Sequence, residues 1–152
     1  MRGYYQMPEA TAAAIDSEGW LRSGDLAYAD TEGYYYITGR SKEVIIRGGE
    51  NIYPAEVEKF LFTHPKLSDA QVVGIPCSYY GEDVVAFVRL KAGCEATSLE
   101  LKRFCRERIA LNKVPANFFF VEQYPLTASG KVQKFKLREM AIQILAEREN
   151  KN

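Results

Sequence analysis

The chain has 152 residues, of which 47% are hydrophobic and 26% charged, and its formal net charge is zero. These proportions are those of a globular protein long enough for one ordinary domain. A zero net charge gives no reason to expect bulk binding to nucleic acid or to an anionic membrane, so any cationic site must be local. No apolar run approaches the length of a membrane span, and no signal-peptide pattern opens the chain.

The first segment, residues 1–39, predicts a short helix followed by a β-hairpin. Pro8 suits the first turn of a helix, which the polar run 16–19 then ends. The turn sequence 30–33 separates two extended, tyrosine-rich pieces, as in a hairpin. The segment has few large apolar side chains besides its tyrosines and Trp20. We therefore do not expect it to fold alone, and we expect the chain to begin inside a larger protein.

The next segment, residues 39–58, contains several turn and strand signals within a short length. A charged break at 39–43 precedes Val44–Ile46, whose β-branched side chains predict a buried strand. Gly48 and Gly49 permit a tight turn and a close approach of the backbone to a ligand. The chain then returns as a second strand, and Pro54 opens a helix.

The remaining chain predicts, in order, two strands, a helix, a strand and a final helix. Thr97, followed three residues later by Glu100, fits a capping box at the start of the first of these helices. The strands are predicted at 71–75, 84–90 and 117–122. The final helix is expected to bury one face formed by Leu137, Met140, Ala141, Ile144 and Leu145. The order predicts an α+β fold, a small mixed β-sheet covered by helices and preceded by the β-hairpin.

The cysteines and the single histidine give no sign of a disulfide framework or a metal site. Cys77, Cys94 and Cys105 are odd in number and form no CxxC pair, which favours a reducing, cytoplasmic setting. Cys105 lies on the apolar face of its predicted helix and is expected to be a small buried hydrophobe. His64 has no ligand cluster around it, so we expect a structural role at a helix end.

Four stretches together resemble the C-terminal part of the adenylate-forming enzymes, which include acyl- and aryl-CoA synthetases, firefly luciferases and the adenylation domains of peptide synthetases. The stretches are GYYQMPEATAAAI, GWLRSGDL, DTEGYYYITGRSKEVIIRGGENIYPAEVE and YPLTASGKVQK. The resemblance covers nearly the whole chain. It implies that residues 1–39 are the tail of a large N-terminal AMP-binding domain and that residues 40–152 are the small C-terminal domain. In that family the small domain closes on the large one in two orientations, one for acyl-adenylate formation and one for thioester formation.

The resemblance assigns roles in the first half-reaction to three residues and a hinge role to a fourth. Asp25, in the GDL motif, would bind the ribose hydroxyls of ATP, and Arg40 would lie near the ribose and phosphate. Lys42 corresponds to the hinge between the two orientations. Lys131 would lie between the acyl carboxylate and the α-phosphate, where a cation offsets the repulsion of two anions. Without the motifs, Asp25 would be a turn residue and Lys131 a solvated loop lysine.

The resemblance also assigns a CoA-binding face. Gly48, Gly49, Glu50 and Asn51 match the hairpin that the family brings to the active site for thioester formation, and Tyr80 matches an aromatic residue near CoA in some aryl-CoA ligases. The segment around Lys113 is less basic and less aromatic than in some members, which leaves this lysine as the segment's only cation.

The resemblance therefore predicts the C-terminal fragment of an acyl- or aryl-CoA synthetase. ATP, CoA and Mg²⁺ would be the cofactors, and the partners would be a small-molecule carboxylic acid and the large N-terminal domain. The fragment alone is expected to be inactive, because the phosphate-binding loop and the acyl pocket lie in that domain. Two alternatives stay open: part of a peptide-synthetase adenylation domain that acylates a carrier protein, and a free-standing binding module without catalysis.

Overall fold

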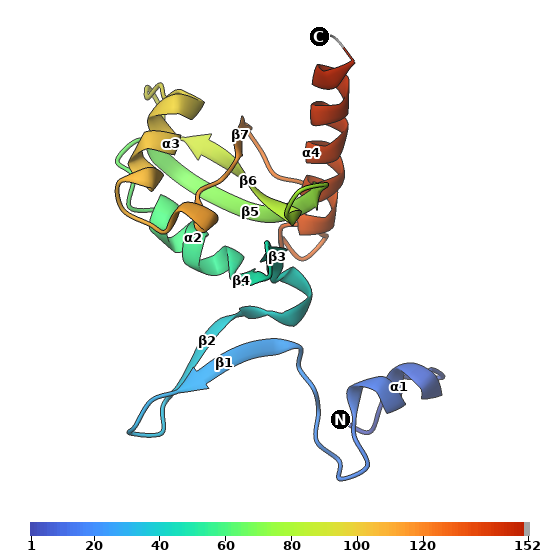
Figure 1. The fold of residues 1–152 in the computed structure, drawn as a ribbon. Coiled ribbons are helices and arrows are strands. Elements are labelled where there is room, and N and C mark those ends of the chain that lie inside the picture. The colour runs from blue at the N-terminus through green and yellow to red at the C-terminus, as the bar shows by residue number, and fades with distance from the viewer. Residues whose placement is uncertain (151–152) are drawn as a thin grey trace. The chain divides into compact units, whose positions relative to one another are not determined.

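The structure is a computed structural model that describes residues 1–150 (Figure 1). The chain divides into two compact units, the first formed by Met1–Lys42 and the second beginning at Glu43. Among the residues described, no helix is both long enough and apolar enough to cross a membrane.

The first unit contains the helix α1 (Pro8–Ala14) and two antiparallel strands, β1 (Asp25–Ala29) and β2 (Tyr35–Arg40). The turn between the strands is closed by Asp30, whose Oδ1 accepts hydrogen bonds from the backbone N–H groups of Glu32 and Tyr34, both at 2.9 Å. The predicted helix and hairpin are thus confirmed. None of residues 1–42 is buried, so this unit has no apolar core of its own.

The second unit is built on a five-stranded mixed sheet. Its strands are β3 (Ile45–Arg47), β4 (Glu50–Ile52), β5 (Leu67–Cys77), β6 (Gly81–Leu90) and β7 (Asn117–Phe120). The path runs β4-β3-β6-β5, and β7 pairs with β6 in parallel while the other pairs are antiparallel. The helices are α2 (Pro54–Leu61), α3 (Ser98–Arg106) and α4 (Lys134–Glu149), with 3₁₀ turns η1 (Ser41–Glu43) and η2 (Leu111–Lys113). The predicted α+β order is confirmed.

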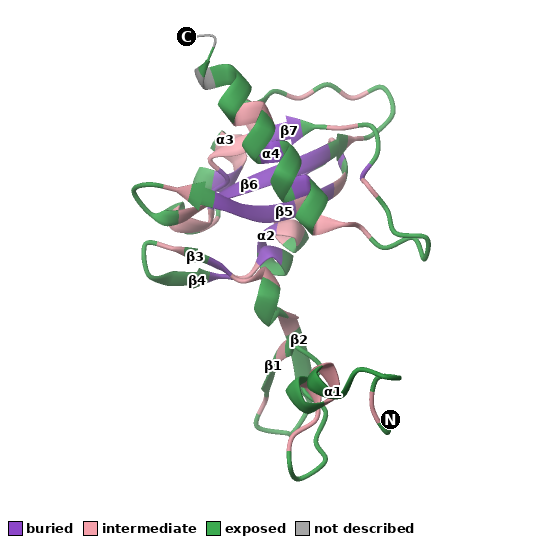
Figure 2. Ribbon diagram, turned by 90° about the vertical axis from the view of Figure 1, so that its right-hand side faces the viewer, coloured by how far each residue is buried: buried purple, intermediate pink, exposed green. Residues whose placement is uncertain are grey.

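Apolar side chains cover both faces of this sheet. Figure 2 shows that the buried residues lie mainly on β5, β6 and β7. Alternate residues of β6 point to opposite faces, as the pleat requires. Val84, Ala86 and Val88 join the cluster that includes residues of α2 and α3. Val85 and Phe87 join the second cluster, which includes residues of α4. A central strand that is buried on both faces explains the continuous apolar run in its sequence.

Met140 was expected on the buried face of α4, but it is 37% exposed, whereas Leu137 and Ala141 of the same face are fully buried. That prediction was wrong for Met140.

Two further local predictions need correction. Val44–Ile46 was expected to be a buried strand, yet Ile45 is 1% exposed and Ile46 is 54% exposed. The strand β3 contacts the core with only one face, so its side chains alternate between the interior and solvent. At α3, the Thr97 hydroxyl accepts the Glu100 backbone N–H at 3.2 Å, but the Glu100 carboxylate pairs with Lys66 at 2.7 Å. Only the Thr97 half of the capping box is therefore seen.

Candidate functional site

Lys131 lies at the end of a tight loop between β7 and α4. The loop is closed by backbone hydrogen bonds from Thr127 N to Lys131 O at 2.8 Å and from Gly130 N to Thr127 O at 2.9 Å. The Lys131 N–H also donates to Thr127 Oγ1 at 3.0 Å. Gly130 has φ +80°, a backbone conformation that favours glycine. The loop therefore fixes the backbone of Lys131 while its side chain stays exposed.

Asp25 and Arg40 face each other across β1 and β2, at the open end of the first hairpin. Arg40 Nε lies 3.1 Å from Asp25 Oδ1, and the Asp25 side chain is 32% exposed. A carboxylate has two oxygens and about four acceptor positions, so Asp25 can pair with Arg40 and still accept hydroxyl donors. The pair thus offers an acceptor and a cation side by side, which suits a ribose and its phosphate.

Lys42 is the last residue of the first unit and the middle residue of η1. Its two neighbours are each attached to their own unit. The Ser41 N–H donates to Gly24 O at 2.9 Å, and Glu43 Oε2 lies 2.9 Å from Lys134 Nζ on α4. Lys42 therefore lies between two attachments, one within each unit.

The Gly48–Gly49 turn joins β3 to β4. Both glycines have positive φ, +59° and +85°, as a two-residue type I′ hairpin requires. The Gly48 N–H donates to Tyr80 O at 2.8 Å, and a Cβ at Gly48 would lie 3.5 Å from Tyr80 Cδ1. The structure therefore brings the predicted Gly48 and Tyr80 together, although they come from different strand connections. Asn51 is exposed on β4, opposite Ile46.

Arg47, which the sequence patterns did not identify, lies at the centre of this face. Its Nε is 2.8 Å from Asp83 Oδ1, and its guanidinium lies 4.3 Å from the centroid of the Tyr80 ring. An Arg47 NH group donates to Asn112 O at 3.1 Å, and the Asn112 side-chain amide donates to Glu50 Oε2. The sequence signal that could have identified Arg47 was its position: it is a charged residue at the end of an apolar strand, directly before a double glycine.

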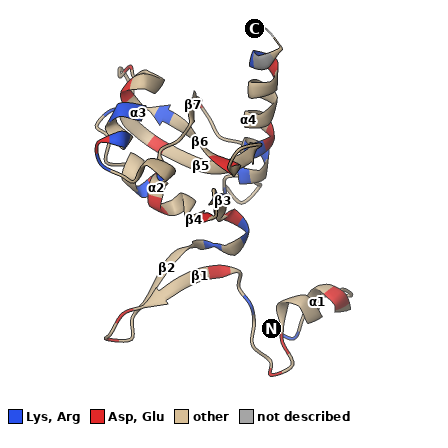
Figure 3. Cartoon of the chain, viewed as in Figure 1, with Lys and Arg blue, Asp and Glu red and all other residues tan. Residues whose placement is uncertain are grey.

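Lys113, the single cation predicted for the neighbouring segment, pairs with Glu56 on α2 at 2.5 Å. Figure 3 shows acidic and basic residues interspersed along the chain, in keeping with its zero net charge. Cationic groups near the Gly48–Gly49 turn are thus matched by carboxylates, and the face is polar without a strong excess of positive charge.

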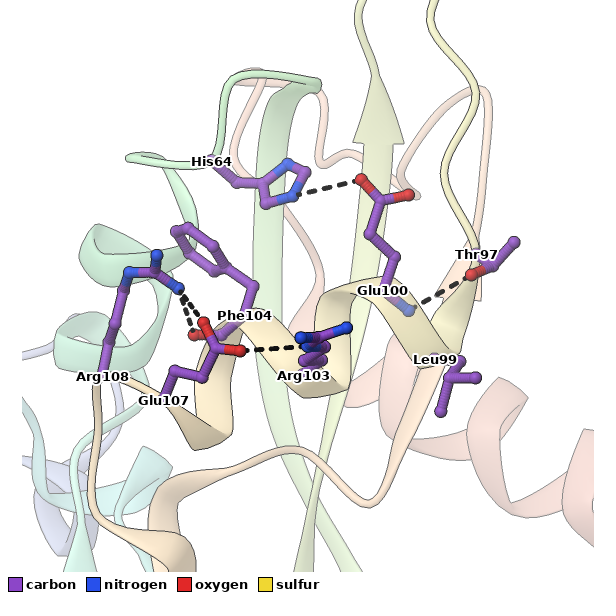
Figure 4. Close-up of a pocket in the computed structure, with 8 residues that line it drawn as sticks. All are labelled: His64, Thr97, Leu99, Glu100, Arg103, Phe104, Glu107 and Arg108. Carbon is purple, nitrogen blue, oxygen red and sulfur yellow. Dashed lines mark hydrogen bonds and ion pairs between the residues drawn. The ribbon is translucent and has the colours of Figure 1, made fainter.

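The hollow beside α3 contains none of the predicted site residues (Figure 4). It has a volume of about 530 Å³ and is bordered by His64, which is only 4% exposed. His64 Nδ1 accepts a hydrogen bond from the Lys66 backbone N–H at 3.3 Å. The imidazole ring packs edge-on against the Phe104 ring, with 4.7 Å between the ring centroids. Burial lowers the pKa of His64, although the nearby Glu100 carboxylate acts in the opposite direction. His64 therefore has the structural role that the sequence predicted.

The predicted residues thus form separate groups. Asp25 and Arg40 meet in the first unit, and the Gly48–Gly49 turn meets Tyr80 in the second. In the view of Figure 2 the β3–β4 hairpin and the loop before α4 lie on opposite sides of the second unit. The second unit therefore presents two different faces, one with Lys131 and one with the double glycine.

The chain is similar to known acyl-CoA ligases. It is 52% identical over 139 residues to the mitochondrial medium-chain acyl-CoA ligase ACSF2 of Macaca fascicularis, covering 91% of this chain and 22% of that protein. The chain spans about a quarter of the length of the curated relatives that it matches.

Solved structures show the same likeness. ATP-bound MatB from Rhodopseudomonas palustris matches with a TM-score of 0.85 and 34% identity, over 91% of this chain and 28% of that one. The o-succinylbenzoate CoA synthetase MenE of Bacillus subtilis, solved with an acyl-adenylate intermediate, matches with a TM-score of 0.83 and 39% identity, over 91% and 28%. Residues 56–131, half of the chain, match the profile of the AMP-binding enzyme C-terminal domain, and with the shared fold this shows that the chain belongs to that family.

Proposed function

We propose that this chain is the C-terminal part of an ATP-dependent acyl-CoA synthetase. The enzyme would activate a carboxylic acid to its acyl-adenylate with release of pyrophosphate, and would then transfer the acyl group to CoA. The observation that carries this proposal is the division of the chain directly after Lys42, with Lys131 and the Gly48–Gly49 turn on different loops of the second unit. Two faces on one movable domain are what two successive half-reactions need.

In the first half-reaction Lys131 would lie between the acyl carboxylate and the α-phosphate. The closed Thr127–Lys131 loop supports this role, because it fixes the backbone from which the side chain extends. Asp25 would accept hydrogen bonds from the ribose hydroxyls, and Arg40 would supply a permanent positive charge near the phosphate. Mg²⁺ belongs to the proposal as the counter-ion of the ATP phosphates.

In the second half-reaction the Gly48–Gly49 turn would lie along the pantetheine arm of CoA. The two glycines leave the backbone uncovered, and Tyr80 lies beside them with 40% of its surface exposed. Glu50 and Asn51 follow on β4 and would line the same passage. Rotation of the second unit about Lys42 would replace the Lys131 face with this face at the active site between the two half-reactions.

The remaining parts of the proposal concern the rest of the protein. Residues 1–39 would complete a large AMP-binding domain, and residues 40–152 would form the mobile domain. The exposure of Trp20, Tyr35 and Ile37 supports the first point, because these side chains would be covered by that domain. A fatty acid is the proposed substrate class, on the strength of the likeness to ACSF2. A cytoplasmic setting is supported by three cysteines that form no disulfide.

The test is a coupled assay on the longer enzyme that carries this chain. The enzyme would be given ATP, Mg²⁺, CoA and a panel of carboxylic acids that includes medium-chain fatty acids. We expect acid-dependent pyrophosphate release and formation of acyl-CoA and AMP. The 152-residue chain alone, the matched control, is expected to release no pyrophosphate. Absence of activity with every acid, or acyl transfer to a carrier protein but not to CoA, would contradict the proposal.

A further inference from the structure

The β3–β4 hairpin is joined to the rest of the sheet by very little backbone pairing. The only register pair between β3 and β6 is Arg47 with Gly81, whereas β5 and β6 pair along almost their whole length. A two-stranded hairpin by itself is marginally stable in water. Side-chain contacts, together with the hydrogen bond from the Gly48 N–H to Tyr80 O, must therefore determine where the Gly48–Gly49 turn lies.

Ile45 and Ile52, at the end of the hairpin away from the turn, are buried in the core. At the turn end one group of polar and aromatic side chains adds contacts, and we call it the Arg47 cluster. Its members come from the β3–β4 hairpin, the β5–β6 connection, the start of β6 and η2, and they are Arg47, Glu50, Tyr80, Asp83 and Asn112. Within it, the Arg47 and Asp83 side chains are only 16% and 17% exposed. A pair so poorly hydrated is screened much less by salt than a surface pair, and its geometry is correspondingly better defined.

The three contacts of Arg47 point in different directions. Its Nε pairs with Asp83, an NH group donates to the Asn112 carbonyl, and the flat guanidinium lies over the Tyr80 ring. Only a planar group with several fixed donors can do all three at once, and a lysine ammonium cannot. The contacts hold together the turn and the aromatic ring to which the proposed function assigns CoA binding.

We propose that Arg47 is a positioning residue for thioester formation: paired with Asp83, it holds the Gly48–Gly49 turn and Tyr80 in the arrangement that receives the pantetheine arm. The inference rests on the proposed function for its chemical meaning. Arg47 itself need not touch CoA, because it acts through the turn and through Tyr80. Adenylate formation uses the Lys131 loop, so it does not depend on this cluster.

Substitution of Arg47 should leave the domain folded. The Ile46 N–H donates to Glu82 Oε2 at 3.0 Å, and the same carboxylate pairs with Arg138 on α4 at 3.0 Å. This second attachment of β3 does not involve the Arg47 cluster. Substitution of Arg47 should therefore change where the Gly48–Gly49 turn lies, while the β3–β4 hairpin itself still forms.

The kinetic test compares Arg47→Lys, Arg47→Leu and Asp83→Asn in the longer enzyme. The control is Arg103→Leu, which removes a pair with Glu107 on the exposed side of α3. For the Arg47 variants we expect kcat/KM for CoA to fall roughly 10- to 100-fold, the cost of a small misplacement. Adenylation, measured by pyrophosphate exchange, should stay within about twofold of wild type by the same reasoning. The double variant Arg47→Leu/Asp83→Asn should lose little more than Arg47→Leu, because the two residues act as a pair.

A second arm needs no enzymatic activity. Amide hydrogen exchange is followed by NMR in the 152-residue chain. The Gly48 amide, which is hydrogen-bonded to Tyr80 O, should exchange at least about tenfold faster in Arg47→Lys than in the wild-type chain. Unchanged Gly48 exchange, unchanged CoA kinetics, or an equal loss of both half-reactions would overturn the proposal. If the wild-type enzyme shows no ligase activity, the proposed function fails, and the exchange result alone decides whether Arg47 holds the turn.

Discussion

The Lys131 backbone N–H donates to Thr127 Oγ1 at 3.0 Å, and the Thr127 N–H donates to Lys131 O at 2.8 Å. These two bonds close the loop without using the lysine side chain. The ammonium group can therefore be removed while the loop keeps its shape, so a substitution of Lys131 tests the side chain alone.

Lys131→Ala in the longer enzyme is expected to slow adenylation by on the order of 10²–10³-fold, because it removes the cation from between two anions. Thioester formation from supplied acyl-adenylate should be preserved. The measurement is acid-dependent pyrophosphate exchange beside acyl-CoA formation, with the exposed Lys136→Ala on α4 as the control. An equal loss in both half-reactions would contradict the assigned role.

Lys42→Pro is expected to impair thioester formation and to spare adenylation. The φ of proline suits a 3₁₀ turn such as η1, so the folded chain should accept it, but the torsion change at the hinge would be blocked. Single-turnover measurements of each half-reaction would show the difference. Lys42→Ala, which keeps the backbone free to rotate, should behave like wild type; a wild-type rate for Lys42→Pro would remove the hinge assignment.

Glu58→Ala is expected to destabilise the second unit by about 1–3 kcal/mol, the cost of leaving a largely buried donor unpaired. The Glu58 carboxylate accepts the Val72 N–H at 2.8 Å and pairs with Lys134 at 2.8 Å, and it is 15% exposed. The free energy of unfolding is measured in urea. Glu56→Ala on the same helix removes only an exposed partner of Lys113 and should cost less than about 1 kcal/mol. Equal losses would refute the explanation.

His64 should make stability depend on pH. Burial lowers the pKa of the folded histidine, while Glu100 raises it and Lys66, Arg108 and Lys91 lower it. In the unfolded chain the pKa is near 6.5. As the pH falls, the unfolded state therefore binds the proton first. The stability that neutral His64 contributes is fully present well above pH 6.5 and is lost as the pH falls below about 6.5. Urea unfolding across this range should show a weaker pH dependence in His64→Gln, and the same dependence in both proteins would argue against this.

The cysteines should differ in reactivity. Burial raises the pKa of Cys105 to about 11, whereas Cys77 and Cys94 are partly exposed. At pH 8 an alkylating reagent should modify Cys77 and Cys94 in the folded chain and reach Cys105 only after unfolding, because the thiolate is the reactive form. Mass spectrometry of the labelled peptides checks the order. Rapid labelling of Cys105 in the native chain would show that α3 opens readily.

Much of the fold could be predicted from local signals. The hairpin turn at Asp30, the double glycine, the helix start at Pro54 and the Thr97 cap each depend on residues a few positions apart. The order of strands and helices followed from these signals together with apolar periodicity. The assignment of Ile46 to a buried strand was wrong, because a short β-branched run does not reveal whether one face or both will be covered.

The sequence by itself therefore determined the elements, their order and the motifs that carry the family likeness. Only the tertiary structure decided which distant residues meet. Arg47 and Asp83 are 36 positions apart, and β7 pairs with β6 in parallel across a helix and a 3₁₀ turn. Such contacts follow from the packing of the apolar faces around the sheet, which local patterns do not record. For this reason the sequence did not predict that the residues of the Arg47 cluster come together at the Gly48–Gly49 turn.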